Sequence, residues 1–326
     1  MNAKIVGVGM YLPEKILTNA DLEQMVETSD EWITTRTGIK ERHITRDDEF
    51  TADMALIAAQ RALENAGVDA AELDLILLST VSPEFSTPSS SCLVQGRLGA
   101  VNAAAIDINT ACSGFVSALI MAQQFIKAET YQNILVIGAD TMTKLTDWED
   151  RKSCVLFGDG AGAVVLKPTT DNDGILAFEM GADGLSQGCL SIPSLKFSEE
   201  DLERRGGQKK RTFWMDGSEV FKFAVRIMTN SMQRILEKAG MTVDDIDLLV
   251  PHQANIRIID GSVKRLKINP DKVYTNIDRT GNTSSACIPM ALCEAVQKGL
   301  LKEGDTLAMV GFGGGLTWGG ALVEFA

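Results

Sequence analysis

One cysteine stands between a predicted strand and a predicted helix. Residues 103–108 have the apolar pattern of a strand, and the apolar periodicity from Phe115 onward predicts a long helix. Cys112 lies between them among small residues. The N-terminus of a helix offers unpaired N–H groups and partial positive charge, which favour a thiolate. Cys112 is therefore a candidate nucleophile, and the alternative is a buried structural cysteine.

Three further features would be positioned with this cysteine. Ligands of open α/β sheets bind beyond the carboxyl ends of the strands. His252 ends a predicted strand, Asn282 lies in a turn, and residues 313–315 are glycines. His252 and Asn282 could donate hydrogen bonds to one carbonyl oxygen and so stabilise an enolate. The Cys112 N–H and a glycine N–H could form an oxyanion hole for acyl transfer. A satisfied structural histidine is the alternative for His252.

The two halves of the chain resemble each other at a constant offset of 173 residues. The segment that begins at Arg61 matches the one that begins at Arg234, and Asn109 matches Asn282. Strand 134–138 matches strand 307–311, and Ser285 is the counterpart of Cys112. Such a repeat predicts an internally duplicated α/β protein. We expect halves at 1–170 and 171–326, with a seam near residues 167–175.

Composition limits the classes of function. The 326 residues are 45% hydrophobic and 23% charged, as in a globular protein, and the net charge of −13 argues against nucleic-acid or anionic-membrane binding. No apolar run approaches the ~18 residues of a membrane span. With no recognisable secretory signal, we expect a cytoplasmic protein whose six cysteines are reduced thiols. Only two histidines are present, so a metal site is not expected.

Several other segments invite specific expectations. Trp32 and Arg36 could bind a nucleotide, or they could be a core-edge tryptophan beside a surface arginine. The glycines at 158–162 favour a tight turn between two strands over a phosphate cradle. Residues 140–152 and the charged segment 196–212 are expected to be loops, the second solvated and mobile.

Four motifs, taken together, resemble beta-ketoacyl-[acyl-carrier-protein] synthase III over essentially the whole chain. They are Thr110-Ala111-Cys112-Ser113-Gly114-Phe115, Pro251-His252-Gln253-Ala254-Asn255, Gly281-Asn282-Thr283-Ser284 and the glycine-rich segment 311–319. The resemblance implies a thiolase-like fold, with two βαβαβαββ halves in five αβαβα layers. It also implies a homodimer that starts type II fatty acid synthesis.

The same resemblance implies a two-step reaction. Cys112 would accept an acyl group from acyl-CoA, and malonyl-acyl-carrier protein would then lose CO₂. His252 and Asn282 would hold the resulting enolate, which attacks the acyl-Cys112 thioester to give 3-oxoacyl-acyl-carrier protein. The N–H groups of Cys112 and Gly314 would form the oxyanion hole. CoA is a substrate here, and neither a cofactor nor a metal is implied.

The resemblance also assigns binding residues. The CoA contacts would be Thr28, Trp32, Arg36, Arg151 and Asn255, with adenine between Trp32 and Arg151. Carrier-protein docking would use a basic group, Lys222, Arg257, Lys264 and Arg265, on an otherwise acidic protein. The malonyl and acyl pockets would be lined by Phe312, Thr87, Met142, Leu156 and Phe157.

Two departures from the family pattern stand out. Thr87 precedes Pro88 where acetyl-preferring members have phenylalanine, at a gate that the dimer partner contributes. The smaller side chain predicts tolerance of longer or branched starter groups. Segment 196–212 is longer than the family pattern, and we expect it to lie near the entry of CoA.

Other classes of protein remain as alternatives. A hydrolase with Cys, His and Asn in this chain order is one, although the repeat and the glycine-rich end argue against it. A relative that makes a secondary metabolite is another. A thiolase would need a second catalytic cysteine after Cys293, where none occurs. A non-catalytic binding module would form no acyl adduct.

Overall fold

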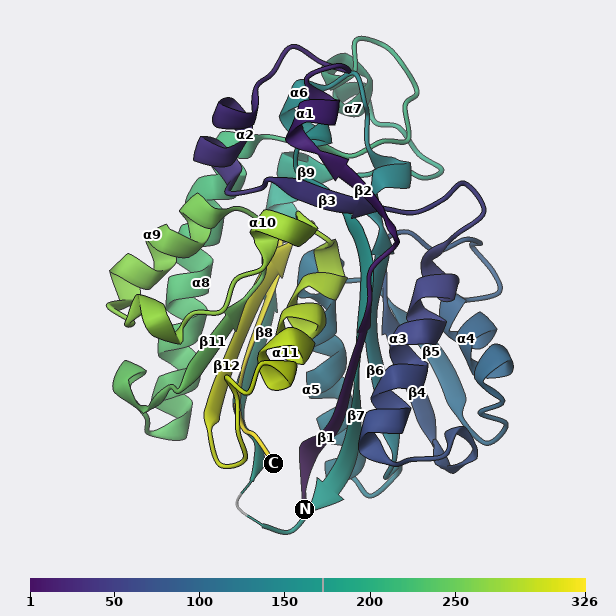
Figure 1. Ribbon diagram of the computed structural model, residues 1–326, viewed down its shortest axis with the longest axis vertical. Coiled ribbons are helices and arrows are strands. Elements are labelled where there is room, and N and C mark those ends of the chain that lie inside the picture. The colour runs from purple at the N-terminus through teal and green to yellow at the C-terminus, as the bar shows by residue number, and fades with distance from the viewer. Residues whose placement is uncertain (172) are drawn as a thin grey trace.

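Two mixed β-sheets form the centre of the computed structural model, which describes residues 1–171 and 173–326 (Figure 1). The first sheet has the order β1 (Asn2–Tyr11), β7 (Asp159–Thr169), β6 (Ile134–Thr141), β4 (Leu75–Ser79), β5 (Ala104–Ile108). The second has the order β11 (Leu248–Pro251), β12 (Thr306–Gly313), β13 (Thr317–Glu324), β8 (Gly174–Ala182). In the first sheet β4 runs parallel to β5 and β6, and in the second β11 runs parallel to β12.

Helices form three layers around these sheets. Helices α3 (Thr51–Ala66) and α4 (Ser90–Leu98) cover the outer face of the first sheet, and α8 (Gly217–Ala239) and α9 (Ile256–Leu266) lie outside the second. Helices α5 (Gly114–Lys127) and α11 (Cys287–Gln297) lie between the sheets, in a continuous apolar core. The layer order is therefore αβαβα, as expected.

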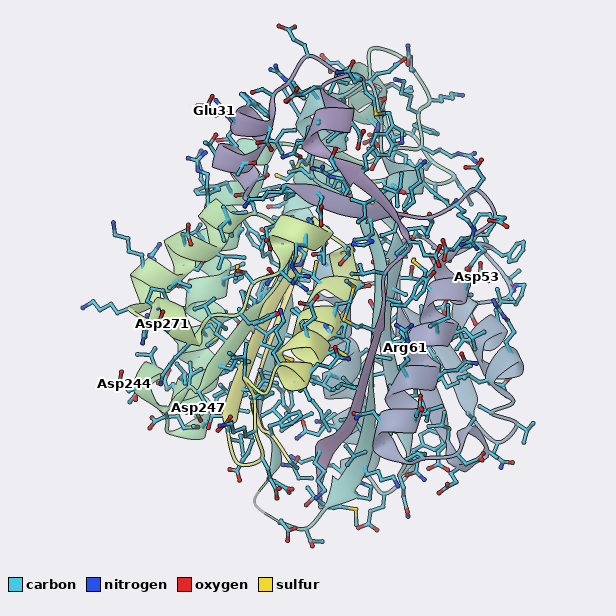
Figure 2. All side chains as sticks on the ribbon, in the orientation of Figure 1. Glu31, Asp53, Arg61, Asp244, Asp247 and Asp271 are labelled. Carbon is cyan, nitrogen blue, oxygen red and sulfur yellow. The ribbon has the colours of Figure 1, made fainter. Side chains whose placement is uncertain are left out.

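Helix α3 shows how the sequence produces the outer layer. Its apolar residues recur at helical spacing and are buried, and Gly67 ends the helix at φ +63°. Figure 2 labels two of its polar residues: Asp53 pairs with Arg97 of α4 at 2.8 Å, and Arg61 donates to the Met10 carbonyl at 2.7 Å. Apolar packing holds the helix on the sheet, while polar contacts join it to its neighbours.

The two halves differ at one strand. In the first half, the elements follow the expected βαβαβαββ order. In the second half, the counterpart of β5 is α10 (Ile277–Thr280), and a single bridge between Leu249 and Val273 replaces the strand pairing. Asp278 and Gly281 disfavour a strand there, and Gly281 has φ +64°. At this place in the βαβαβαββ layout, the second half therefore has a parallel bridge where the first half has a full strand.

Three local expectations are wrong. Gly160 and Gly162 lie inside β7, where a Cβ on Gly162 would approach the Met290 backbone nitrogen to 2.6 Å, so these glycines allow close packing of α11. Segment 196–212 contains α7 (Glu199–Arg204), and Lys210 pairs with Asp147 at 2.9 Å. Segment 140–152 includes the end of β6, a 3-10 turn over Met142–Leu145 and the start of α6 (Arg151–Cys154).

Short elements cap the carboxyl ends of the strands, at the top of Figure 1. They comprise β2 (Lys15–Thr18), β3 (Glu41–Ile44), α1 (Asn19–Leu22), α2 (Asp30–Thr37), α6, α7, β9 (Leu190–Ser191) and β10 (Trp214–Met215). The expected seam at 167–175 falls between β7 and β8, except for residue 172, which lies outside the described residues. Among the described residues, no helix combines the length and apolarity needed to cross a bilayer.

Candidate active site

Cys112 lies where the chain passes from β5 into α5, as expected. It is the middle residue of the 3-10 turn η2 (Ala111–Ser113), and Ala111 has φ +48°, which is uncommon for a residue with a side chain. A Cβ on Gly114 would lie 1.8 Å from the Ser79 hydroxyl oxygen, so glycine is required where α5 begins. The turn thus places the sulfur at the carboxyl edge of the first sheet.

His252 follows β11 directly and is fully buried. Burial lowers the pKa of its imidazole to about 3, so the ring is neutral near pH 7. Its Nδ1 atom is buried without a hydrogen-bond partner among the described residues. The edge of the ring meets Phe312, with the two ring centroids 5.3 Å apart. A neutral imidazole has one N–H to donate and one nitrogen to accept.

Asn282 has an amide whose direction is fixed by the backbone. Its Oδ1 accepts the N–H of Ser284 at 2.9 Å, and its own N–H donates to the Leu156 carbonyl at 2.9 Å. Because the amide oxygen already accepts the Ser284 N–H, the Nδ2 group remains available to donate a hydrogen bond to a ligand. Asn282 is therefore held as a hydrogen-bond donor.

One cavity of about 460 Å³ brings these residues together. Cys112, His252 and Asn282 line it, and Phe312 and Gly313 lie beside them. The lining residues also include exposed side chains, which mark the mouth: Arg36, Lys222 and Arg257. Leu156, Phe157, Trp32 and Asn255 complete the set of sequence-predicted residues in its wall. The cavity therefore runs from a cationic surface to the cysteine.

A second cavity, of about 490 Å³, also has Cys112 in its wall. Met142, Ser284 and Gly314 line it, together with an apolar group of Val81, Leu145, Leu190, Ile192 and Phe213. Leu190 and Phe213 border both cavities. The cysteine is thus accessible from two spaces, as a nucleophile that holds one substrate while it meets another would need to be.

Two opposing influences act on the protonation of Cys112. Burial raises the pKa of the thiol to about 12, and a hydrogen bond to Ser284 opposes this rise. Loss of hydration around the sulfur thus works against the thiolate that the helix N-terminus favours.

The glycine-rich turn lies directly against the cysteine. A Cβ on Gly313 would come within 2.5 Å of the Cys112 amide nitrogen, so only glycine leaves this approach open. Gly314, the expected second donor of an oxyanion hole, borders the second cavity. The turn places a backbone segment without side chains beside Cys112.

The expected adenine slot is filled. The Arg151 guanidinium carbon lies 4.9 Å from the centroid of the Trp32 ring, and that of Arg36 lies 4.6 Å from it. Arg151 thus stacks directly on Trp32, leaving no room for a base between them. Neither Arg151 nor Thr28 lines the main cavity, and the Thr28 hydroxyl is buried without a partner among the described residues.

The residues predicted to dock the carrier protein, and Thr87, lie at different places relative to the two cavities. Lys222 on α8 pairs with Glu219 at 2.8 Å, whereas Lys264 and Arg265 lie in the last turn of α9, away from both cavities. Thr87 is exposed and borders neither cavity of its own chain.

Sequence reasoning missed two residues near Cys112. Ser284 lies 3.4 Å from the Cys112 sulfur, and Asp140 binds Ser285. The repeat could have identified both, because Asp140 is the counterpart of Gly313 and Ser284 that of Ala111. Within residues 1–171 and 173–326, no cluster of His, Cys, Asp or Glu could hold a metal ion.

Known proteins resemble this chain along its length. The family model of 3-oxoacyl-[acyl-carrier-protein (ACP)] synthase III matches residues 106–184, and the model of the C-terminal part of that synthase matches residues 236–325. A beta-ketoacyl-[acyl-carrier-protein] synthase III of Caldanaerobacter subterraneus subsp. tengcongensis is 51% identical, covering 99% of this chain and 98% of the relative. One of Geobacillus kaustophilus is 53% identical over 98% of this chain and 97% of its own length. The crystal structure of the Aquifex aeolicus synthase superimposes with a TM-score of 0.93 at 47% identity, covering 99% of this chain and 100% of that one.

Proposed function

Because the chain belongs to the 3-oxoacyl-[acyl-carrier-protein] synthase III family, we propose that Cys112, His252 and Asn282 carry out its two half-reactions. The protein is a condensing acyltransferase of fatty acid synthesis with the thiolase-like fold.

The first half-reaction acylates Cys112. Its sulfur bonds to the carbonyl carbon of acyl-CoA, the bond to the CoA sulfur breaks, and the cysteine proton ends on the departing CoA. Negative charge develops on the thioester oxygen, which the N–H groups of Cys112 and Gly314 stabilise. The open backbone beside Gly313 supports this role, since any side chain there would approach the Cys112 nitrogen to 2.5 Å.

The second half-reaction forms the carbon–carbon bond. Malonyl-acyl-carrier protein loses CO₂, and its thioester oxygen takes the enolate charge. His252 and Asn282 each donate a hydrogen bond to that oxygen. Two observations support this assignment: the pKa of about 3 keeps the imidazole neutral, and the Asn282 Oδ1 is already bound to Ser284 N–H. The enolate carbon then attacks the acyl-Cys112 carbonyl, and the carbon–sulfur bond breaks to give the 3-oxoacyl product. The sulfur leaves as a thiolate, which takes a proton from water.

Both substrates enter through the cationic mouth of the main cavity. Trp32, Arg36 and Asn255 contact CoA from the wall of that cavity, and Thr28 and Arg151 join them once Arg151 moves off the Trp32 ring. The acidic carrier protein docks on Lys222 and Arg257 at the mouth and on Lys264 and Arg265 of α9. No metal or cofactor takes part in either step.

A homodimer completes the assembly, with halves 1–170 and 171–326 in each chain. Strand β5 supports this, because it ends the first sheet with its Ile106 side chain 43% exposed. Phe85 and Val101 are also exposed. An open apolar sheet edge readily pairs with a second copy. Thr87 would then act on the partner's pocket, and its small side chain permits longer or branched starters.

The observation that carries the proposal is that three side chains from distant segments line a single cavity. Intact-mass measurement after exposure to acetyl-, isobutyryl- and hexanoyl-CoA tests it, with Cys112→Ser as the control. We expect acyl adducts on the wild-type protein only, and conversion to 3-oxoacyl-carrier protein once malonyl-acyl-carrier protein is added. Absence of every adduct would refute the proposed nucleophile, and an acetyl adduct alone would refute the wider starter range.

A further inference from the structure

The Cys112 sulfur has a neighbour that the two half-reactions above leave unused. The Ser284 hydroxyl oxygen lies 3.4 Å from Sγ, within reach of an S–H···O hydrogen bond. Ser284 is buried and forms part of the wall of the second cavity. A hydroxyl can accept a hydrogen bond from a thiol and donate one to a thiolate. This contact can therefore persist as the sulfur changes its protonation state.

The backbone at Ser284 is held in an uncommon conformation. Its φ of +53° is in the left-handed region, which residues with side chains rarely adopt. The Asn282 Oδ1 accepts its N–H at 2.9 Å, and the next residue, Ser285, donates its N–H and hydroxyl to Asp140 at 3.1 and 2.8 Å. These bonds fix the turn and hence the direction of the Ser284 hydroxyl. Strain of this kind, maintained beside a reacting atom, points to a function.

The other half of the chain provides a comparison. Ala111, the counterpart of Ser284, has almost the same φ, +48°, and carries only a methyl group. The shape of the turn therefore does not require a hydroxyl. The Ser284 hydroxyl is present in the second-half turn, which contacts the Cys112 sulfur.

The environment of the sulfur explains what the hydrogen bond between Cys112 and Ser284 can do. Burial raises the pKa of the Cys112 thiol to about 12, and the bond to Ser284 is the first influence that opposes the rise. The neutral His252 ring has no hydrogen bond to the sulfur in the described structure. Ser284 is thus the side chain placed to stabilise developing negative charge on the sulfur.

From this contact we infer that Ser284 is a further catalytic residue of the acylation half-reaction. Its hydroxyl accepts the Cys112 S–H before attack and donates to the sulfur as charge develops there. The carbonyl carbon bonds to Sγ, the bond to the CoA sulfur breaks, and the thiol proton ends on the departing CoA. The inference rests on the proposed function and adds one residue to it. Decarboxylation, which uses His252 and Asn282, does not use this hydroxyl.

Ser284→Ala tests the inference, and the Ala111 conformation indicates that alanine fits such a backbone. The measurements are the rate of iodoacetamide alkylation of Cys112 at fixed pH, single-turnover acylation by acyl-CoA, and decarboxylation of malonyl-acyl-carrier protein. We expect the rates of alkylation and acylation to fall about tenfold, because the variant loses one hydrogen bond to a charged group. The rate of decarboxylation should stay within about twofold of wild type.

Ser285→Ala is the matched control, one residue along the same turn. It loses the hydroxyl bonds to Asp140 and to the Ser79 carbonyl, both at 2.8 Å, and keeps the backbone N–H bond to Asp140. It should therefore lower the melting temperature while Cys112 is alkylated at the wild-type rate. If Ser284→Ala does not fold, Ser284→Gly replaces it, because glycine readily adopts the same φ.

Two outcomes would overturn the inference. One is wild-type alkylation and acylation in the folded alanine variant. The other is an equal loss in both half-reactions with a lower melting temperature, which would make Ser284 purely structural. Alkylation requires no acyl-CoA, so failure of the wild-type protein to accept an acyl group would refute the proposed function and leave the serine comparison intact.

Discussion

Two turns of the same backbone shape pack against each other at the centre of the molecule, and they differ in their side chains and in their surroundings. Turn η2 carries Cys112, and η7 (Ser284–Ala286) carries Ser285 at the corresponding position. Each begins with a residue at positive φ, +48° at Ala111 and +53° at Ser284. Since the backbone shape is shared, any difference in reactivity must come from the side chains, Cys112 in one turn and Ser285 in the other, and from what surrounds each turn.

The strand end beside each turn supplies that difference. Asp140 of β6 accepts the N–H and hydroxyl of Ser285, and it also accepts bonds from Thr80, Val81 and Ser82. At the corresponding position of β12, Gly313 has no side chain, and the space beside the Cys112 amide stays open. A buried carboxylate closes one turn, while a glycine leaves the other available to a substrate. The same scaffold thus yields one turn fixed by side-chain bonds and one turn whose backbone amide stays open.

Gly313→Ala should have the largest effect, because it fills the open space that distinguishes the Cys112 turn. The added Cβ would be placed 2.5 Å from the Cys112 nitrogen and 2.9 Å from the Ala111 Cβ, so it obstructs the oxyanion position. We expect acylation of Cys112 to slow about 1,000-fold, as for loss of an oxyanion donor. Single-turnover mass spectrometry measures it. Gly96→Ala is the control, because nothing lies within 4 Å of its added Cβ; equal rates for both variants would contradict the open-space interpretation.

Asp140→Asn tests the closed turn. The carboxylate accepts its bonds while fully buried, and the amide presents an NH₂ group to donors in place of one oxygen. We expect the free energy of unfolding to fall by about 3 kcal/mol. Urea unfolding measures this change. The exposed Asp48→Asn should stay within about 0.5 kcal/mol of wild type, and a similar result for Asp140→Asn would mean that its bonds do not hold the turn.

The two asparagines provide a matched pair. Asn282 binds Ser284 N–H at 2.9 Å and lines the main cavity, whereas its counterpart Asn109 is exposed and lies 3.4 Å from Ala111 N. Asn282→Ala should lower malonyl-acyl-carrier-protein decarboxylation about 100-fold, because one donor to the enolate is lost. Asn109→Ala should lower it less than about threefold, since it is outside the main cavity. Release of labelled CO₂ measures both, and similar losses would remove the functional distinction between them.

The pH dependence of Cys112 alkylation sharpens the comparison further. A thiol with a pKa of about 12 is mostly protonated below that pH. Its thiolate fraction, and therefore the alkylation rate, should rise about tenfold per pH unit from pH 6 to 9 without a plateau. Peptide mass spectrometry of iodoacetamide-treated protein measures it, with the exposed Cys92 followed in the same digest. A plateau near pH 7 would support the thiolate expected from the helix position instead.

Much of the scaffold was predictable because its signals are local or periodic. The spacing of apolar residues placed α3, and the strand-to-helix junction placed Cys112. The constant offset of 173 residues identified the duplicated layout. These features depend on repeat patterns and short-range backbone preferences, which a single sequence displays directly.

The errors arose where distant residues decide local structure. Gly160 resembles a turn residue, but its position in β7 follows from the close approach of α11. Segment 196–212 resembles a free loop, but Lys210 is paired with Asp147 and Glu149 in the cap. In both places the local composition permitted several conformations, and contacts with distant segments selected one.

The sequence by itself determined the fold class and the repeat, and it singled out Cys112, His252 and Asn282 as candidates. Only the tertiary structure decided that burial raises the pKa of the Cys112 thiol, that Asp140 closes one turn, and that Ser284 contacts the sulfur. The physical reason is that hydration and hydrogen bonding depend on every group packed around an atom. Cys112 and Ser284 are 172 positions apart, so no local pattern could report their contact.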